Sequence, residues 1–152
     1  MKRYIFLLVL FFFFTKSLWA SFILIPMDEK QKDHLKAYGI TYWVLQQNVI
    51  DAHWLLNYRG GSFAFPYSKV FEKECQIRGV SFEVIPDGGF ANILNEIADP
   101  EANMDDIKLE KAPLIAVYTP DVNEKGQTVQ PWDDAVTMVL TYAEIPYEKL
   151  YD

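Results

Sequence analysis

The residues best suited to hold a ligand are Arg59, Gly60, Gly61 and Ser62, a short run that directly follows an apolar segment. The two glycines leave backbone N–H groups free to face an anion, and an arginine guanidinium forms paired hydrogen bonds with carboxylates and phosphates. The run therefore predicts a site for a small anionic or peptide ligand. The alternative is an ordinary turn in which Arg59 pairs with a neighbouring carboxylate.

The residue types used in catalysis or metal binding are few. Cys75 is the only cysteine, and it is expected inside a helix, one turn after Phe71. That position favours a small buried hydrophobe over a nucleophile. His34 and His53 are the only histidines, and no spacing of three or four ligands surrounds them. We therefore predict no metal site and no cofactor, and the sequence assigns no catalytic residue.

Three further polar runs follow or open predicted elements. Asp87 to Gly89 and Thr119 to Asp121 each come after a predicted strand, where ordinary turns explain them. Asp133 and Asp134 stand at the start of the last predicted helix, where carboxylates suit the positive end of the helix dipole. None of the three is predicted to be catalytic. Trp43, Trp54 and the tyrosines are able to stack on a sugar, but their helical and strand spacing places them in the core first.

The elements that position these residues alternate along the chain. Short apolar runs predict strands at 22–25, 54–58, 80–85, 107–109, 113–118 and 147–151. Helical periodicity predicts helices over the stretch that holds Leu35, Tyr38, Tyr42 and Leu45 on one face, and over 67–78, 91–98 and 132–144. This alternation predicts a three-layer α/β domain with a mostly parallel sheet, amidotransferase-like or flavodoxin-like.

Single residues mark where the helices begin, end and meet other elements. Asp28 is predicted to cap the first helix of the domain. Gly39, in the middle of that helix, either weakens it or lets another element approach closely. Gly79 is placed to end the helix that contains Cys75.

Residues 1–20 have the layout of a secretory signal peptide. Lys2 and Arg3 precede an unbroken apolar run from Ile5 to Phe14, and Ala20 supplies a small residue for cleavage. The chain is then exported, to the periplasm or the extracellular space, without a stable membrane span. An uncleaved anchor, with Lys16 at the membrane surface, is the alternative.

Residues 21–152 then form one α/β domain with an acidic surface. The chain holds 14 basic and 21 acidic side chains; three of the basic ones lie in residues 1–20, so 11 remain and the net charge of the domain is −10. Such a surface repels phosphate backbones, which excludes nucleic acid as a partner. The domain is expected to be either complete in itself or the front part of a longer one.

Several segments resemble a family of exported bacterial proteins of unknown mechanism. The segments are Leu35-Lys-Ala-Tyr-Gly39, Trp54-Leu-Leu-Asn-Tyr-Arg-Gly-Gly-Ser-Phe63, Lys111-Ala-Pro113, Ile115-Ala-Val-Tyr118, Pro131-Trp-Asp-Asp-Ala-Val136 and Thr141-Tyr-Ala-Glu-Ile-Pro-Tyr147. Members often carry the label "asparagine synthetase B". The resemblance implies a class I glutamine-amidotransferase-like α/β domain, of which this chain is the N-terminal part.

The residues do not support asparagine synthesis itself. A glutaminase of that kind needs an N-terminal cysteine whose free amine serves as the base, and Lys2 and Ser21 occupy the two candidate positions. Two functions therefore stay open. The first is a ligand-binding or scaffolding part of an exported protein, and the second is an N-terminal fragment of an amidotransferase-like enzyme.

Overall fold

The computed structural model describes residues 21–118, 125–127 and 135–150. The predicted signal peptide and the runs at 119–121 and 133–134 therefore lie outside the described residues. The elements are β1 (Ser21–Ile25), α2 (His34–Gln46), β2 (Ala52–Leu56), the 3₁₀ turn η1 (Tyr58–Gly60), β3 (Ser62–Pro66), α3 (Lys69–Arg78), β4 (Glu83–Pro86), α4 (Asp87–Ile97), β5 (Asp105–Leu109), β6 (Ala116–Tyr118), α5 (Ala135–Tyr142) and β7 (Glu148–Leu150).

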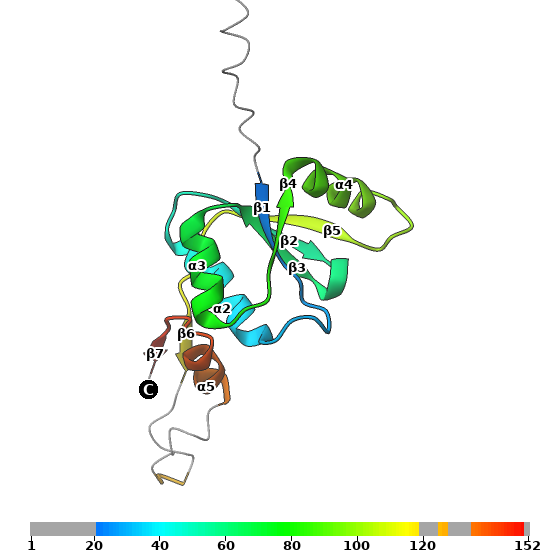
Figure 1. The fold of residues 1–152 in the computed structure, drawn as a ribbon. Coiled ribbons are helices and arrows are strands. Elements are labelled where there is room, and N and C mark those ends of the chain that lie inside the picture. Colours follow the sequence, from blue (N-terminus) through cyan, green and yellow to red (C-terminus); the bar gives the residue numbers. More distant parts are fainter. Residues whose placement is uncertain (1–20, 119–124, 128–134, 151–152) are drawn as a thin grey trace, which may run out of the picture.

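The main sheet has five strands in the order β4-β1-β3-β2-β5, and every neighbouring pair is antiparallel (Figure 1). The prediction of a mostly parallel, amidotransferase-like or flavodoxin-like sheet is therefore wrong. The prediction failed at β3, because the residues that form this strand, Ser62–Pro66, were expected to be part of a connection between a strand and a helix. As a strand, it lies between β1 and β2 and runs against both, which makes the sheet antiparallel.

The first six elements of the sheet and its covering helices follow the split β-α-β pattern. β1-α2-β2 and β3-α3-β4 interleave so that β3 lies between β1 and β2, and β4 pairs with the other side of β1. This is the ferredoxin-like arrangement. Strand β5 adds a fifth strand along β2, which confirms the expected edge strand in this region.

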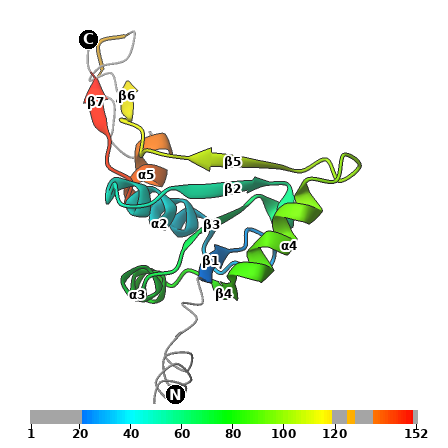
Figure 2. The same cartoon turned by 90° about the horizontal axis from the view of Figure 1, so that it is seen from above.

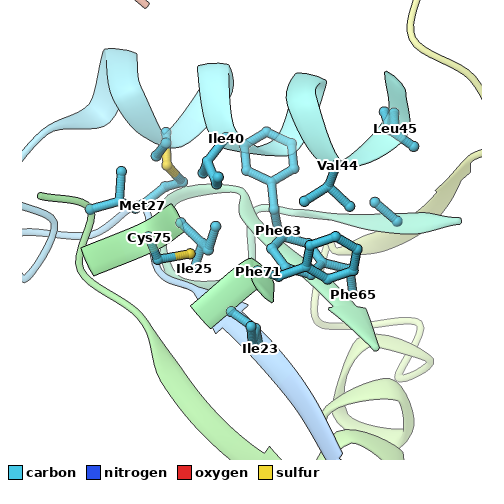
Figure 3. Packing of buried hydrophobic residues seen from close by; sticks show 13 residues of the cluster. Ile23, Ile25, Met27, Ile40, Val44, Leu45, Phe63, Phe65, Phe71 and Cys75 are labelled. Atoms are coloured by element: carbon cyan, nitrogen blue, oxygen red, sulfur yellow. The ribbon is translucent and has the colours of Figure 1, made fainter. Parts of the chain in front are cut away.

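Each face of the sheet carries its own core because successive strand residues point to opposite sides. Helices α2 and α3 cover one face and α4 covers the other (Figure 2). Beneath α2 and α3, aliphatic side chains surround the aromatic rings of Phe63, Phe65 and Phe71 (Figure 3). Beneath α4, Leu24 and Leu55 of the strands contact Phe90 and its helix neighbours.

Local signals at the helix ends are only partly as expected. The cap of α2 is Asp33, whose Oδ1 accepts from the Lys36 N–H at 2.9 Å, so the prediction of Asp28 as the cap is wrong. Gly79 ends α3 in the left-handed conformation, at a φ of 71°. Asp87 to Gly89 form the first turn of α4 and no separate loop.

The remaining elements form a second, smaller unit, β6-α5-β7, that lies against α2. Its two strands are parallel, with Ala116 opposite Glu148. Gly39 confirms the expected close approach: a Cβ at this position would collide with the backbone carbonyl of Ala143, just past the end of α5. The Glu144 carboxylate accepts a hydrogen bond from Lys36 at 2.5 Å and forms an ion pair with Arg78 at 3.1 Å. The small unit is therefore fixed to α2 and α3 by both packing and charge.

Candidate functional site: an aromatic pocket beside helix α2

A pocket with a volume of about 260 Å³ opens between α2, the main sheet and the chain that follows β5. Its ten lining residues are Tyr38, Thr41, Tyr42 and Leu45 of α2, Trp54 of β2, Phe63 of β3, Leu109 of β5, Lys111 and Pro113 of the following segment, and Ile145 after α5. The lining is mostly apolar and aromatic. Pockets that bind small molecules typically have this character, with a few polar groups that fix the orientation of the ligand.

The helical part of the lining follows from residue spacing. Positions three and four apart on a helix share one face, and Tyr38, Tyr42 and Leu45 obey this rule. The same spacing led to the expectation that this face is buried in the core. The structure buries Tyr42 and Leu45 but leaves Tyr38 44% exposed. The face therefore meets the pocket, and Tyr38 lies at its rim.

The aromatic rings of the pocket come from three elements and are held in fixed relative positions. The rings of Trp54 and Phe63 are stacked, with centroids 6.1 Å apart and planes 23° apart. The Tyr38 ring meets Phe63 edge-on, at 5.3 Å and 74°. Phe63 is only 3% exposed, so it forms the floor of the pocket. Because Trp54 and Phe63 lie on paired strands, directly opposite each other, the sheet itself sets their geometry.

The polar groups of the lining fall into two kinds. The Tyr42 hydroxyl donates to the Pro113 carbonyl at 2.8 Å and the Thr41 hydroxyl donates to Ala37, so both are already satisfied. Within the described residues, the Tyr38 hydroxyl, the Trp54 Nε1–H and the Lys111 ammonium have no hydrogen-bonding or ionic partner. Lys111 is also the only charged residue among the ten that line the pocket. The unpaired groups are available to a ligand.

The predicted site at Arg59 to Ser62 lies in the turn between β2 and β3. The Arg59 side chain donates from Nε to Asp28 at 2.8 Å and from Nη1 to Glu83 at 2.9 Å. The hydrogen bonds to the two carboxylates raise the pKa of Arg59, and the hydrogen bond from Arg59 lowers the pKa of Asp28. This arrangement matches the alternative interpretation of the sequence, an ordinary turn in which the arginine pairs with neighbouring carboxylates. An anion would have to displace them, so the ligand-binding interpretation of this loop stays a prediction.

The backbone of the same turn is tightly constrained. Arg59 has a φ of 47°, in the left-handed region that costs a non-glycine residue about 1–3 kcal/mol. Its carbonyl accepts from the Met27 N–H at 3.1 Å, and a Cβ at Gly60 would lie 2.5 Å from the Met27 carbonyl oxygen. The buried Ser62 hydroxyl donates to the Tyr58 carbonyl at 2.9 Å. The turn thus uses its glycines and its serine to join β2 to β3, close against the chain after β1.

Gly61 connects this turn to the aromatic pocket. A Cβ at Gly61 would lie 3.5 Å from Nε1 of Trp54. The glycine predicted as part of a ligand loop therefore lies beside a pocket wall. The sequence prediction missed the pocket itself, because its residues are scattered over three strands, a helix and two connections. No local pattern joins them.

Cys75 is a buried structural residue, as expected. Its side chain is fully buried, and this burial raises the pKa of the thiol to about 12. A thiol that stays protonated at neutral pH is a poor nucleophile. His34 lies on the exposed start of α2, and its Nε2 lies 3.1 Å from the Met27 carbonyl.

His53 has a partner that the sequence did not indicate. Its Nδ1 lies 2.9 and 3.0 Å from the two carboxylate oxygens of Asp106, on the neighbouring strand β5. Asp51, close to His53 in the sequence, instead pairs with Lys108 at 2.7 Å. Phe22 and Phe90 meet the His53 ring edge-on. The pair ties the edge strand β5 to the sheet, on the face covered by α4.

Two other hollows lack the features of the aromatic pocket. One, of about 420 Å³, is lined by Lys32, Gln76 and the segment 79–82, and the other, of about 350 Å³, lies beside β6 and β7. Neither brings together three aromatic rings and a single cation.

Among the described residues, no group of three or more histidine, cysteine, aspartate or glutamate side chains is placed to hold a metal ion. No helix in this part of the chain has the length and apolar character needed to cross a membrane.

The comparisons with known proteins add no family to these observations. No protein-family model, no curated protein and no solved structure matches the chain. The resemblance to the family labelled asparagine synthetase B therefore stays a hypothesis, and the class of site is defined by its geometry alone: an apolar, aromatic pocket on an antiparallel α/β domain.

Proposed function

We propose that the chain is a small-molecule-binding domain of an exported protein, with its ligand in the pocket between α2 and strands β2, β3 and β5. The observation that carries the proposal is the set of three rings, from Tyr38, Trp54 and Phe63, beside three polar groups that have no partner among the described residues. The fold does not imply this function, since ferredoxin-like domains serve many unrelated roles. Export rests on the layout of residues 1–20.

A neutral aromatic fragment tests the proposal. We expect 2-naphthamide, added to the full chain, to shift the indole N–H signal of Trp54 in ¹H–¹⁵N NMR spectra. The matching signal of Trp43, which contacts Phe71 and Arg78 away from the pocket, is expected to stay in place. Removing an aromatic wall with Tyr38→Ala should weaken binding up to about tenfold, as expected for the loss of one aromatic contact.

Tyr67→Ala provides the matched control, because Tyr67 is a comparably exposed tyrosine that does not line the pocket. It should leave the affinity unchanged. Absence of any shift at Trp54, or equal losses in the two tyrosine variants, would contradict the proposal.

An alternative proposal is that the chain is the N-terminal part of a glutamine-amidotransferase-like enzyme. The observation in its favour is the parallel β6-α5-β7 unit, because such units build the parallel sheets of that class. Cys75 is too deeply buried to supply the nucleophile. Release of glutamate from glutamine tests this alternative. Turnover by the chain would favour the enzyme, and loss of that turnover in Cys75→Ala would in addition contradict the structural role of the thiol.

A further inference from the structure

We infer that the ligand of this pocket is a planar aromatic molecule of one or two rings that carries an anionic group, with the anion paired to Lys111. The inference rests on the proposed function, which it deepens by naming the chemical class of the ligand. The shape of the walls, the charge of the lining and the polar groups without partners in the described part of the chain all favour this class of ligand.

The shape of the walls favours a flat ligand. Trp54 and Phe63 are stacked nearly parallel, and the Tyr38 ring stands almost perpendicular to Phe63. Aromatic side chains gain most from other rings in offset-stacked or edge-on contacts, and this pocket presents both ring orientations. Its volume of about 260 Å³ lies just below the usual range of roughly 300–1,000 Å³. One or two rings match this volume, and a dinucleotide is too large.

The charge of the lining favours an anion. Lys111 is the only charged residue that lines the pocket, and it forms no ion pair within the described part of the chain. Other cations of the domain, among them Lys36, Arg59, Arg78 and Lys108, are paired with carboxylates. The chain as a whole has a net charge of −7, so its overall field repels anions. An anionic ligand would therefore depend on this one local ammonium group.

The remaining polar groups fit the same class of ligand. The Trp54 Nε1–H is a donor only, so its partner must be an acceptor, such as a carboxylate oxygen. The Tyr38 hydroxyl can also donate. Neither has a partner among the residues that the structure describes. Two donors and one ammonium, with no carboxylate in the lining, select against cationic ligands.

Three probes of nearly equal shape test the charge preference: 2-naphthoate, 2-naphthamide and 2-naphthylmethylamine. We expect the full chain to bind the naphthoate about three- to fivefold more tightly than the amide, the gain typical of one partly exposed ion pair. The protonated amine should bind most weakly. Added salt should reduce the preference for the naphthoate, because it screens an exposed ion pair.

Variants assign the preference to Lys111. Lys111→Met should make the naphthoate and the amide bind equally, and Lys111→Arg should restore the preference. Lys73→Met removes the same charge from the exposed face of α3, outside the pocket, and should leave the preference intact. Equal binding of naphthoate and amide to the unmodified chain, or a preference that survives Lys111→Met, would overturn the inference while the pocket proposal stands. If no probe binds, the proposed function itself fails.

Discussion

The backbone carbonyl of Ala143 lies against Gly39, in the middle of helix α2, at a distance that only a residue without a side chain allows. This contact holds the β6-α5-β7 unit against the main domain and so positions Ile145 in the wall of the pocket. The glycine that weakens a helix in isolation is therefore required where the chain just after α5 packs on α2.

Gly39→Ala should destabilise the protein by about 1–3 kcal/mol, because the added methyl group must push α5 away from α2. Urea unfolding of the full chain, followed by circular dichroism, measures the change. Gly88→Ala is the matched control, since Gly88 is also helical and a Cβ there meets nothing within 4 Å. It should be neutral or stabilise the protein by up to about 1 kcal/mol. Equal effects of the two substitutions would contradict the packing role of Gly39.

Glu144 should make this attachment sensitive to acid. The hydrogen bond from Lys36, assisted by Arg78, lowers the pKa of the Glu144 carboxyl below its ordinary value of 4.5. A carboxyl with a lowered pKa in the folded state contributes stability above its unfolded pKa, and that contribution is lost as the pH falls through the folded pKa. The free energy of unfolding should therefore decline below pH 4.5 less steeply in Glu144→Gln than in the unmodified protein.

The matched control for Glu144 is Glu29→Gln, which changes an exposed carboxyl with no ion pair in the described part of the chain. It should leave the acid dependence as it is in the unmodified protein. A Glu144→Gln curve parallel to that of the unmodified protein would rule out this role of the carboxylate.

Arg59→Ala should destabilise the protein by about 1–3 kcal/mol, because it leaves the carboxylates of Asp28 and Glu83 without their partner. Chemical denaturation measures this loss, with Lys73→Ala as a surface control expected within about 0.5 kcal/mol of the unmodified protein. The Arg59→Ala variant also distinguishes the aromatic pocket from the turn at Arg59 to Ser62 as the ligand site. 2-Naphthoate should still bind this variant. Loss of that binding would instead favour the sequence prediction of a ligand at Arg59 to Ser62.

Cys75 should be almost unreactive in the folded protein. Burial raises the pKa of its thiol from 9.0 to about 12, so the thiolate fraction at pH 8 falls roughly a thousandfold. An aromatic disulfide that releases a coloured thiolate when it reacts should modify Cys75 only when the protein is unfolded in urea. Because the folded pKa lies above the unfolded value, this group also makes stability fall as the pH rises above 9.0. Rapid modification of the native protein would contradict this burial.

The sequence predicted element types better than it predicted their arrangement. Phe22–Ile25, the helix around Phe71 and Cys75, and the edge strand at 107–109 all appear where expected, because their apolar spacing is strong. The prediction of a parallel sheet was wrong because Ser62–Pro66 follows two glycines and ends in a proline, and both residue types are turn signals. Strand direction depends on which strands become neighbours, and no local pattern contains that information.

The candidate site could not be predicted from local sequence patterns, for a related reason. Arg59 was singled out because its charge and glycine neighbours are consecutive, yet its partners, Asp28 and Glu83, lie far away in the sequence. Tyr38, Trp54 and Lys111 come together only when three strands and a helix are in place. Their individual residue types pointed to core or surface positions, and only tertiary structure combines them.

The position of β1 in the sheet determines when the protein can fold. Both of its neighbours come later in the chain, at Phe63–Pro66 and Glu83–Pro86. A chain that emerges from the ribosome therefore carries its first strand without a partner until some forty further residues have followed it, an interval in line with the slow formation of long-range strand pairs. The main sheet can therefore form around β1 only after β3 and β4 have both been synthesised, which ties its folding to synthesis of the chain as far as Pro86.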